Sequence, residues 1–171
     1  IFGGVAFVFW NEYRQNQMVM LEGKLYQSSL KNDNDEMVKI INEYSGAEAA
    51  HLAAFKLAQS LCERGDFKGA RDLLLKQQGQ LSSALDPLIT LALARVYWQM
   101  GENDEALKIL NDKQLGEKSP YENEALFVKA QILEKTGKID EARSLFQRLA
   151  ITEGIDASIK KIAQFKSAVS A

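Results

Sequence analysis

The chain has 171 residues, enough for one domain or a short repeat array with an apolar interior. Its 21 basic and 23 acidic residues nearly cancel, which gives no reason to expect nucleic acid, and its single cysteine excludes a fold cross-linked by internal disulfides. Only two prolines occur, while Ala, Leu, Glu, Lys and Gln are abundant, so we expect an all-α fold.

The chain begins with an apolar run, Ile1 to Trp10, that carries no charge. At about 1.5 Å per residue, this run would cross roughly half of a hydrocarbon layer of about 30 Å, so we expect it to belong to a longer apolar segment. Phe9, Trp10, Tyr13 and Arg14 are residue types that collect where a membrane helix leaves the bilayer. We therefore interpret residues 1–14 as the C-terminal part of a transmembrane anchor. A buried amphipathic helix or the apolar part of a signal peptide is the alternative.

Residues 15–46 are predicted to form a linker helix and a degenerate first hairpin. Apolar residues at helical spacing continue the first helix: Met18, Leu21, Leu25 and Leu30. The polar cluster at residues 32–36 lacks the glycine and the closing glutamate of a calcium loop, so we expect a turn and a helix cap there. A short amphipathic helix follows, marked by Met37, Ile40, Ile41 and Tyr44.

The most regular part of the chain is residues 47–153, where small residues recur every 36 positions. They are Ala58, Gly65 and Ala70; Ala94, Gly101 and Ala106; and Ala130, Gly137 and Ala142. This period predicts three helical hairpins, with helices at about residues 47–64 and 67–77, 87–100 and 103–111, and 120–136 and 139–149. A last helix at about residues 155–168, within the segment 154–171, is expected to cap the array.

Each small residue of this pattern has an expected role. The alanines let the two helices of a hairpin approach closely, and the glycine ends the first helix in a left-handed conformation. Two helix starts are also marked by a residue before proline: Asp86 and Ser119 are predicted to cap the helices that follow them. Glu122, three residues after Ser119, is predicted to complete a capping box.

These residues resemble the tetratricopeptide repeat, which has a small residue at its eighth position, Gly at the fifteenth, Ala at the twentieth and an aromatic residue or Leu at the twenty-fourth. Leu74, Leu110 and Phe146 occupy the last position here. The period is longer than the usual 34, and the tryptophan of the pattern is absent. The expected fold is therefore an all-α, tetratricopeptide-like solenoid of helical hairpins, preceded by a truncated transmembrane helix.

Nearly the whole chain also resembles the YfgM-type family of ancillary subunits of the bacterial SecYEG translocon. The resemblance rests on the order of parts: Trp10-Asn11 after the apolar run, Leu57-Ala58-Gln59, Leu93 to Val96, Glu105 to Lys108, and Gly137 before Ala142-Arg143-Ser144. It implies a single-pass protein of the bacterial inner membrane with its repeat domain in the periplasm. Such proteins bind the membrane-anchored chaperone PpiD beside the Sec channel, where emerging polypeptides pass.

In tetratricopeptide arrays the first helix of each hairpin lines the concave face, at positions i, i+4 and i+7. The corresponding residues here are Phe55, Gln59 and Cys62; Leu91, Arg95 and Trp98; and Phe127, Gln131 and Glu134. Arg95 and Trp98 are the leading candidates for partner binding, because Arg and Trp carry much of the binding energy of protein interfaces. Core packing is the alternative for Trp98 and the favoured interpretation for Phe55, Leu91 and Phe127. An ion pair with a neighbouring carboxylate is the alternative for Arg95.

The sequence contains no phosphate-binding loop, HExxH pair or Cys/His cluster, so we expect no enzyme, metal or cofactor. The only histidine, His51, is expected to be solvated or to cap a helix. The predicted function is a membrane-anchored periplasmic scaffold for protein–protein interaction, ancillary to the Sec translocon and its periplasmic chaperones. The alternative is an envelope-assembly adaptor, or a self-associating structural repeat protein unrelated to secretion.

Overall fold

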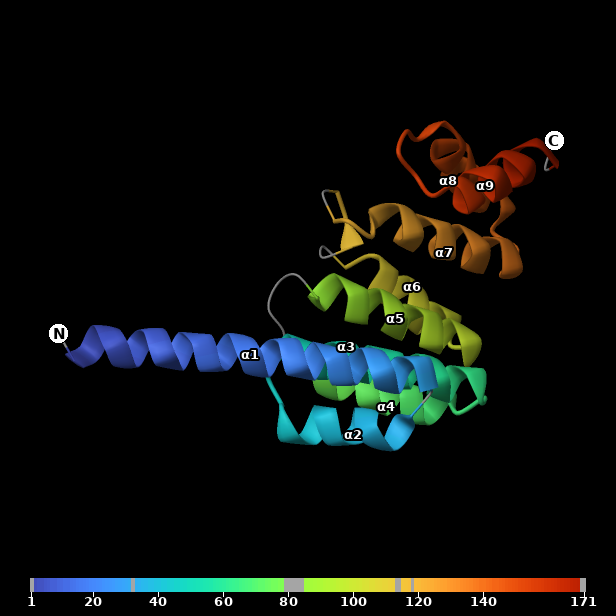
Figure 1. Cartoon of the computed structure of the whole chain (residues 1–171). Coiled ribbons are helices and arrows are strands. Elements are labelled where there is room, and N and C mark those ends of the chain that lie inside the picture. Colours follow the sequence, from blue (N-terminus) through green and yellow to red (C-terminus); the bar gives the residue numbers. More distant parts are fainter. Residues whose placement is uncertain (1, 32, 79–84, 113–114, 118, 170–171) are drawn as a thin grey trace. The chain divides into compact units, whose positions relative to one another are not determined.

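The computed structural model describes residues 2–31, 33–78, 85–112, 115–117 and 119–169, with side chains from residue 15 to residue 168. The helices in these ranges are α1 (Phe2–Lys31), α2 (Asn34–Glu43), α3 (Glu48–Glu63), α4 (Phe67–Gln77), α5 (Asp86–Gln99), α6 (Asn103–Leu110), α7 (Glu122–Lys135), α8 (Ile139–Ile151) and α9 (Ala157–Val169) (Figure 1). No strand occurs in the described ranges. The all-α class is confirmed, and the repeat helices begin and end within two residues of their predicted bounds.

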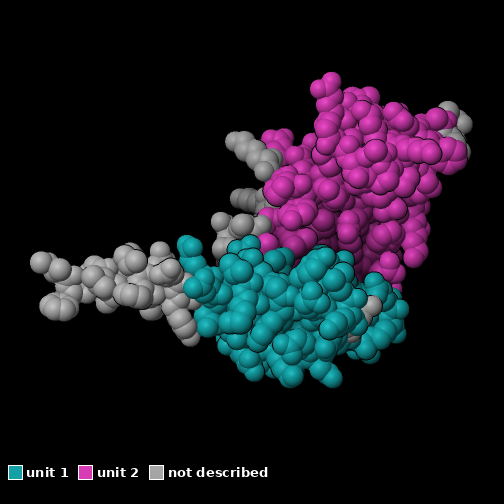
Figure 2. Space-filling view, viewed as in Figure 1, with its two compact units in different colours: residues 1–82 teal, residues 83–171 magenta. Residues whose placement is uncertain are grey.

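The chain divides into two compact units, residues 1–82 and residues 83–171 (Figure 2). In unit 1, α1 packs on α2 and α3, α2 packs on α3, and α3 packs on α4. In unit 2, α5 pairs with α6 and α7 with α8, while α7 also contacts α5 and α6, and α9 packs on α7 and α8. The three predicted hairpins are therefore formed, and the last helix closes unit 2 as expected.

The first helix is continuous through the predicted anchor and the predicted linker helix, since α1 runs from Phe2 to Lys31. Among the described residues, none of the helices combines the length and the apolar character that a bilayer span requires. The anchor at residues 1–14 therefore stays a prediction, and its first residue lies outside the described ranges.

One turn geometry recurs in all three regular hairpins. Gly65, Gly101 and Gly137 have φ of 80°, 81° and 81°, the left-handed conformation that the sequence predicts for them. In each turn, the N–H of the residue after the glycine donates to the carbonyl five residues earlier: Asp66 to Leu61, Glu102 to Tyr97, and Lys138 to Leu133, each at 2.9 Å. This bond defines a Schellman motif, which satisfies carbonyls left open at the end of the first helix.

The turn between α1 and α2 is closed by the same bond. The N–H of Asp33 donates to the carbonyl of Ser28 at 2.8 Å, and the carboxylate of Asp33 accepts from the N–H of Glu36 at 3.0 Å. The turn and helix cap predicted for the polar cluster are thus confirmed. Asn32, in the glycine position, lies outside the described residues.

Aligning this turn with the next one shows how the first hairpin is degenerate. Asp33 then corresponds to Asp66, a shift of 33 positions, and Leu25 and Met37 take the places of Ala58 and Ala70. Leu25 and Met37 are 8% and 2% exposed and lie in the core of unit 1 with residues of α3. The first hairpin therefore keeps the turn of the repeat but has larger residues where its two helices meet.

The alanines that recur every 36 positions are all buried, between 0% and 3% exposed. Ala94 and Ala106 lie in one core cluster of unit 2, and Ala130 and Ala142 lie in another, so each pair contributes one residue from each helix of its hairpin. Their predicted place at the helix contacts is confirmed.

The two predicted proline-linked caps are wrong. Helix α5 already includes Asp86, its N-cap residue is Leu85, and no side chain caps it. Helix α7 begins at Glu122, so Ser119 lies too far upstream to cap it, and the carboxylate of Glu122 pairs with Arg148 of α8. In both cases the helix starts one or two residues away from the position that the local motif indicates.

The burial of these recurring alanines leads to a stability prediction. Ala106→Leu adds three carbons at a position that is 0% exposed, so it should lower the free energy of unfolding by about 1–3 kcal/mol through overpacking. Lys108→Leu, which places the same side chain on an exposed position of the same helix, should change it by less than about 0.5 kcal/mol. Urea unfolding monitored by circular dichroism measures both; equal midpoints for the two variants would contradict the assigned packing.

Candidate partner-binding surface

Helices α5 and α7 are the first helices of the two hairpins in unit 2, and they are in contact. They carry five of the predicted partner-binding residues outside the core, which we call the α5–α7 surface: Arg95, Trp98, Phe127, Gln131 and Glu134. The sixth predicted residue, Leu91, is 3% exposed and lies in the core of unit 2. Its side chain stabilises the fold, in line with the core packing favoured for this position.

Arg95 is the most exposed residue of the α5–α7 surface. Desolvation lowers the pKa of its guanidinium, and the negative charge of Glu124 on α7 opposes that shift. The group remains a cation at physiological pH, because arginine keeps its proton in proteins. Among the described residues Arg95 makes no ion pair within 4 Å, so its partly exposed positive charge interacts with Glu124 only at longer range.

Trp98 is half-buried and packs against the core cluster that contains Leu91 and Ala94. Its indole Nε1 is buried and has no hydrogen-bond partner among the described residues. Both interpretations of this residue therefore apply in part, since one portion of the ring belongs to the core and the rest is open to solvent.

Two residues on the α7 side of the surface contact other helices of unit 2. Phe127 is half-buried and meets Phe146 edge to face, with ring centroids 6.2 Å apart at 70°. The ammonium group of Lys166 on α9 donates hydrogen bonds to both carboxylate oxygens of Glu134, at 2.8 and 2.9 Å. Glu134 thus ties α9 to α7, while Gln131 is half-buried and retains amide groups at the surface.

In unit 1 the predicted residues lie on α3, where Phe55 and Cys62 are half-buried and Gln59 is exposed. The turn alignment adds residues that sequence reasoning missed, because its shift of 33 positions places Tyr26 of α1 where α3 has Gln59. Val19, Tyr26 and Leu30 are 68%, 63% and 63% exposed on α1. Matching Asp33 with Asp66 in the sequence would have revealed this register.

His51 differs from its expected solvated or capping role. It is 4% exposed, and its Nδ1 lies 2.7 Å from Oε1 of Gln77, which is itself 7% exposed. The pair joins the start of α3 to the end of α4 and provides each buried polar group with a partner. The two residues are 26 positions apart, and no local sequence pattern links them.

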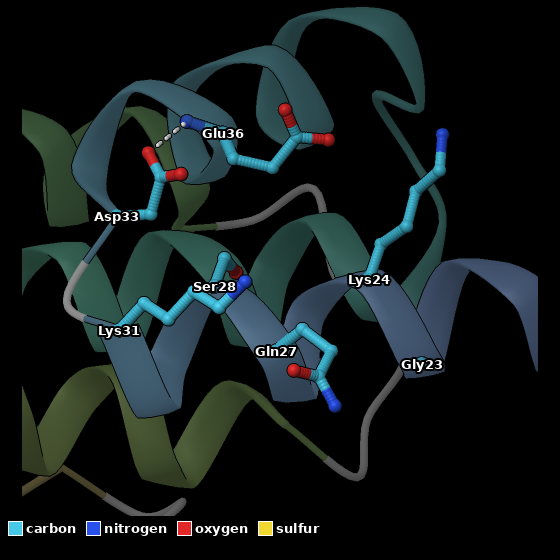
Figure 3. Close-up of a pocket in the computed structure, with 7 residues that line it drawn as sticks. All are labelled: Gly23, Lys24, Gln27, Ser28, Lys31, Asp33 and Glu36. Atoms are coloured by element: carbon cyan, nitrogen blue, oxygen red, sulfur yellow. Dashed lines mark hydrogen bonds between the residues drawn. The ribbon is translucent and has the colours of Figure 1, made fainter.

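A hollow of about 350 Å³ lies beside α1 in unit 1 (Figure 3). Gly23, Lys24, Gln27, Ser28 and Lys31 of α1 line it together with Asp33 and Glu36 at the start of α2. Lysines and carboxylates are mixed there, which gives the hollow no preference for one sign of charge. Within the part of the chain that the structure describes, no group of three His, Cys, Asp or Glu side chains is placed to hold a metal ion.

The fold and the α5–α7 surface define a helical-hairpin repeat protein. A family model for the tetratricopeptide repeat-like domain matches residues 1–168, and the chain belongs to that family. Domains of this kind are typical of protein–protein interaction scaffolds.

Two crystal structures are similar to the chain: a Podosopora anserina protein described as a kinesin light chain with nearly identical TPR-like repeats, and its Q17M variant. Their TM-scores are 0.61 and 0.62, each at 18% identity, covering 91% of this chain and 84% of theirs. This similarity shows the fold alone. A comparison with curated proteins gives no match.

The surroundings of Cys62 predict that its thiol is alkylated slowly in the native chain. Burial raises the pKa of this cysteine, and the carboxylates of Asp66 and Glu63 raise it further. The thiolate is the reactive form, so at pH 8 the native chain should react with iodoacetamide several-fold more slowly than the urea-unfolded chain. The rate should also rise with pH around a higher midpoint in the native state. Equal rates and midpoints in the two states would contradict the assigned environment.

Proposed function

We propose that the chain is a membrane-anchored periplasmic scaffold that binds protein partners, ancillary to the Sec translocon and its periplasmic chaperones. The observation that carries this proposal is the α5–α7 surface, which combines an exposed cation, Arg95, with the partly open aromatic side chains of Trp98 and Phe127. Membership of the tetratricopeptide repeat-like family supports a binding role. The resemblance to YfgM-type subunits along nearly the whole chain supports the Sec assignment.

The composition of this surface favours a polypeptide ligand. The guanidinium of Arg95 is planar and has several N–H donors that suit a carboxylate, and Trp98, three residues further along α5, offers apolar area beside it. Phe127 on α7 adds a second partly open aromatic ring. A segment that combines an acidic side chain with an apolar one fits this pair of features. The proposed partners are the SecYEG translocon, a PpiD-type membrane-anchored chaperone and emerging polypeptides. Binding is the whole of the proposed activity, with no enzymatic step.

The proposed location is the bacterial inner membrane, with one membrane pass and the repeat units in the periplasm. The apolar run Ile1 to Trp10 and the aromatic and cationic residues that follow it support this topology. Helix α1 then provides a continuous link from the proposed anchor to the first hairpin, because it extends without interruption to Lys31.

Reversing the charge at Arg95 tests the proposed surface. In inner-membrane preparations, Arg95→Glu should reduce co-purification of SecYEG and of the PpiD-type chaperone by about tenfold or more, as expected when a central interface arginine is lost. Lys108→Glu makes the same charge change at an exposed position of α6 and should leave co-purification unchanged.

Lys108→Glu should keep the unfolding midpoint of the parent, because its side chain is exposed. Arg95→Glu places a carboxylate near Glu124 and should lower the midpoint by only a few degrees, so the chain still folds. Recovery of both partners with Arg95→Glu at the level of Lys108→Glu would remove the α5–α7 surface from the proposal.

A further inference from the structure

Helix α1 has two apolar faces, and the hairpins of unit 1 use only one of them. Leu21 and Leu25, 3% and 8% exposed, lie in the core of unit 1 with residues of α2 and α3. Val19, Tyr26 and Leu30 lie on the opposite side of the helix and are 68%, 63% and 63% exposed. Large apolar side chains that remain exposed along one line of a helix indicate an interaction surface.

The spacing of the exposed residues is that of a two-stranded coiled coil. The line is Asn16, Val19, Gly23, Tyr26 and Leu30, with intervals of three, four, three and four residues. In heptad terms Asn16, Gly23 and Leu30 are a positions, and Val19 and Tyr26 are d positions. We call these five residues the α1 seam. Its period of 3.5 is the one that keeps two helices in contact along a common line.

The residues in and beside the α1 seam favour a second copy of α1 in parallel orientation. An asparagine at a single a position, as Asn16 is here, specifies an in-register pair, because its amide bonds with the same residue of the other strand. In a parallel pair the flanking Glu22 faces Gln27 of the second copy, with no like charges opposed. An antiparallel pair centred on Gly23 would bring the two copies of Glu22 together, and the repulsion of their like charges disfavours it.

We propose that the α1 seam is a self-association site at which two chains pair through their α1 helices, parallel and in register. Gly23 makes the pairing weak. A Cβ at this position would meet nothing within 4 Å, so nothing in unit 1 requires a glycine there, and the central a position has no side chain to fill the hole opposite. The residues of the α1 seam are distinct from those of the α5–α7 surface, so self-pairing and partner binding use different side chains.

Cysteine cross-linking of the purified full chain tests the pairing. In a Cys62→Ser background, Val19→Cys places thiols from the two copies against each other, so mild oxidation should yield a disulfide-linked dimer. Lys24→Cys, at an exposed position of the same helix outside the α1 seam, is the matched control. We expect Val19→Cys to cross-link about tenfold faster. Equal rates would overturn the proposal, because non-specific association through the apolar N-terminal run would affect both positions alike.

A variant designed to strengthen the pairing distinguishes a coiled coil through the α1 seam from non-specific hydrophobic association. In the Val19→Cys chain, Gly23→Leu fills the empty a position and should increase the cross-linking rate several-fold, whereas Lys24→Leu adds the same side chain outside the α1 seam and should not. An equal increase with both leucines, or with neither, would overturn the coiled-coil geometry. Unfolding midpoints of the two variants confirm that each still folds.

Discussion

The structure depends on one hydrogen bond, repeated in every hairpin from α1–α2 to α7–α8. The N–H at the start of each second helix donates to a carbonyl five residues earlier, at 2.8 or 2.9 Å. In the three regular hairpins the bond forms because a glycine adopts φ near 80°. It sets where the first helix ends and where the second begins, and the buried alanines then set how closely the two helices pack.

This constraint also determines which residues are free to vary. Because the turns align, positions at a fixed distance before each turn occupy the same place on every first helix. Tyr26, Gln59, Arg95 and Gln131 form one such set. The glycine of the turn and the two alanines of the helix contact are the same in the three regular hairpins, whereas this set changes from phenol to amide to cation. In unit 2 this set supplies Arg95 and Gln131 to the α5–α7 surface, which is why Arg95 is central to the proposed function.

The sequence predicts the features that depend on local spacing, and the structure supplies those that depend on distant pairs. The recurrence of small residues every 36 positions was sufficient to place the repeat helices and the left-handed glycines. It could not reveal that His51 meets Gln77, or that Glu134 meets Lys166, because these partners are 26 and 32 positions apart and lie on different helices. The cap predicted at Asp86 failed because the helix begins one residue earlier than the local motif indicates. The correspondence of Tyr26 with Gln59 was missed because the first hairpin is shifted by 33 positions instead of 36.

The central claim, that a left-handed glycine turn organises each of the three regular hairpins, is tested most directly by comparing Gly101→Ala with Gly101→Asn in urea unfolding. A Cβ on Gly101 would meet nothing within 4 Å, so any cost comes from the backbone conformation at φ 81° and not from a clash. Alanine should lower the free energy of unfolding by about 1 kcal/mol or more, and asparagine by clearly less, because asparagine tolerates this conformation better. Equal unfolding free energies for the two variants and the parent chain would contradict the account.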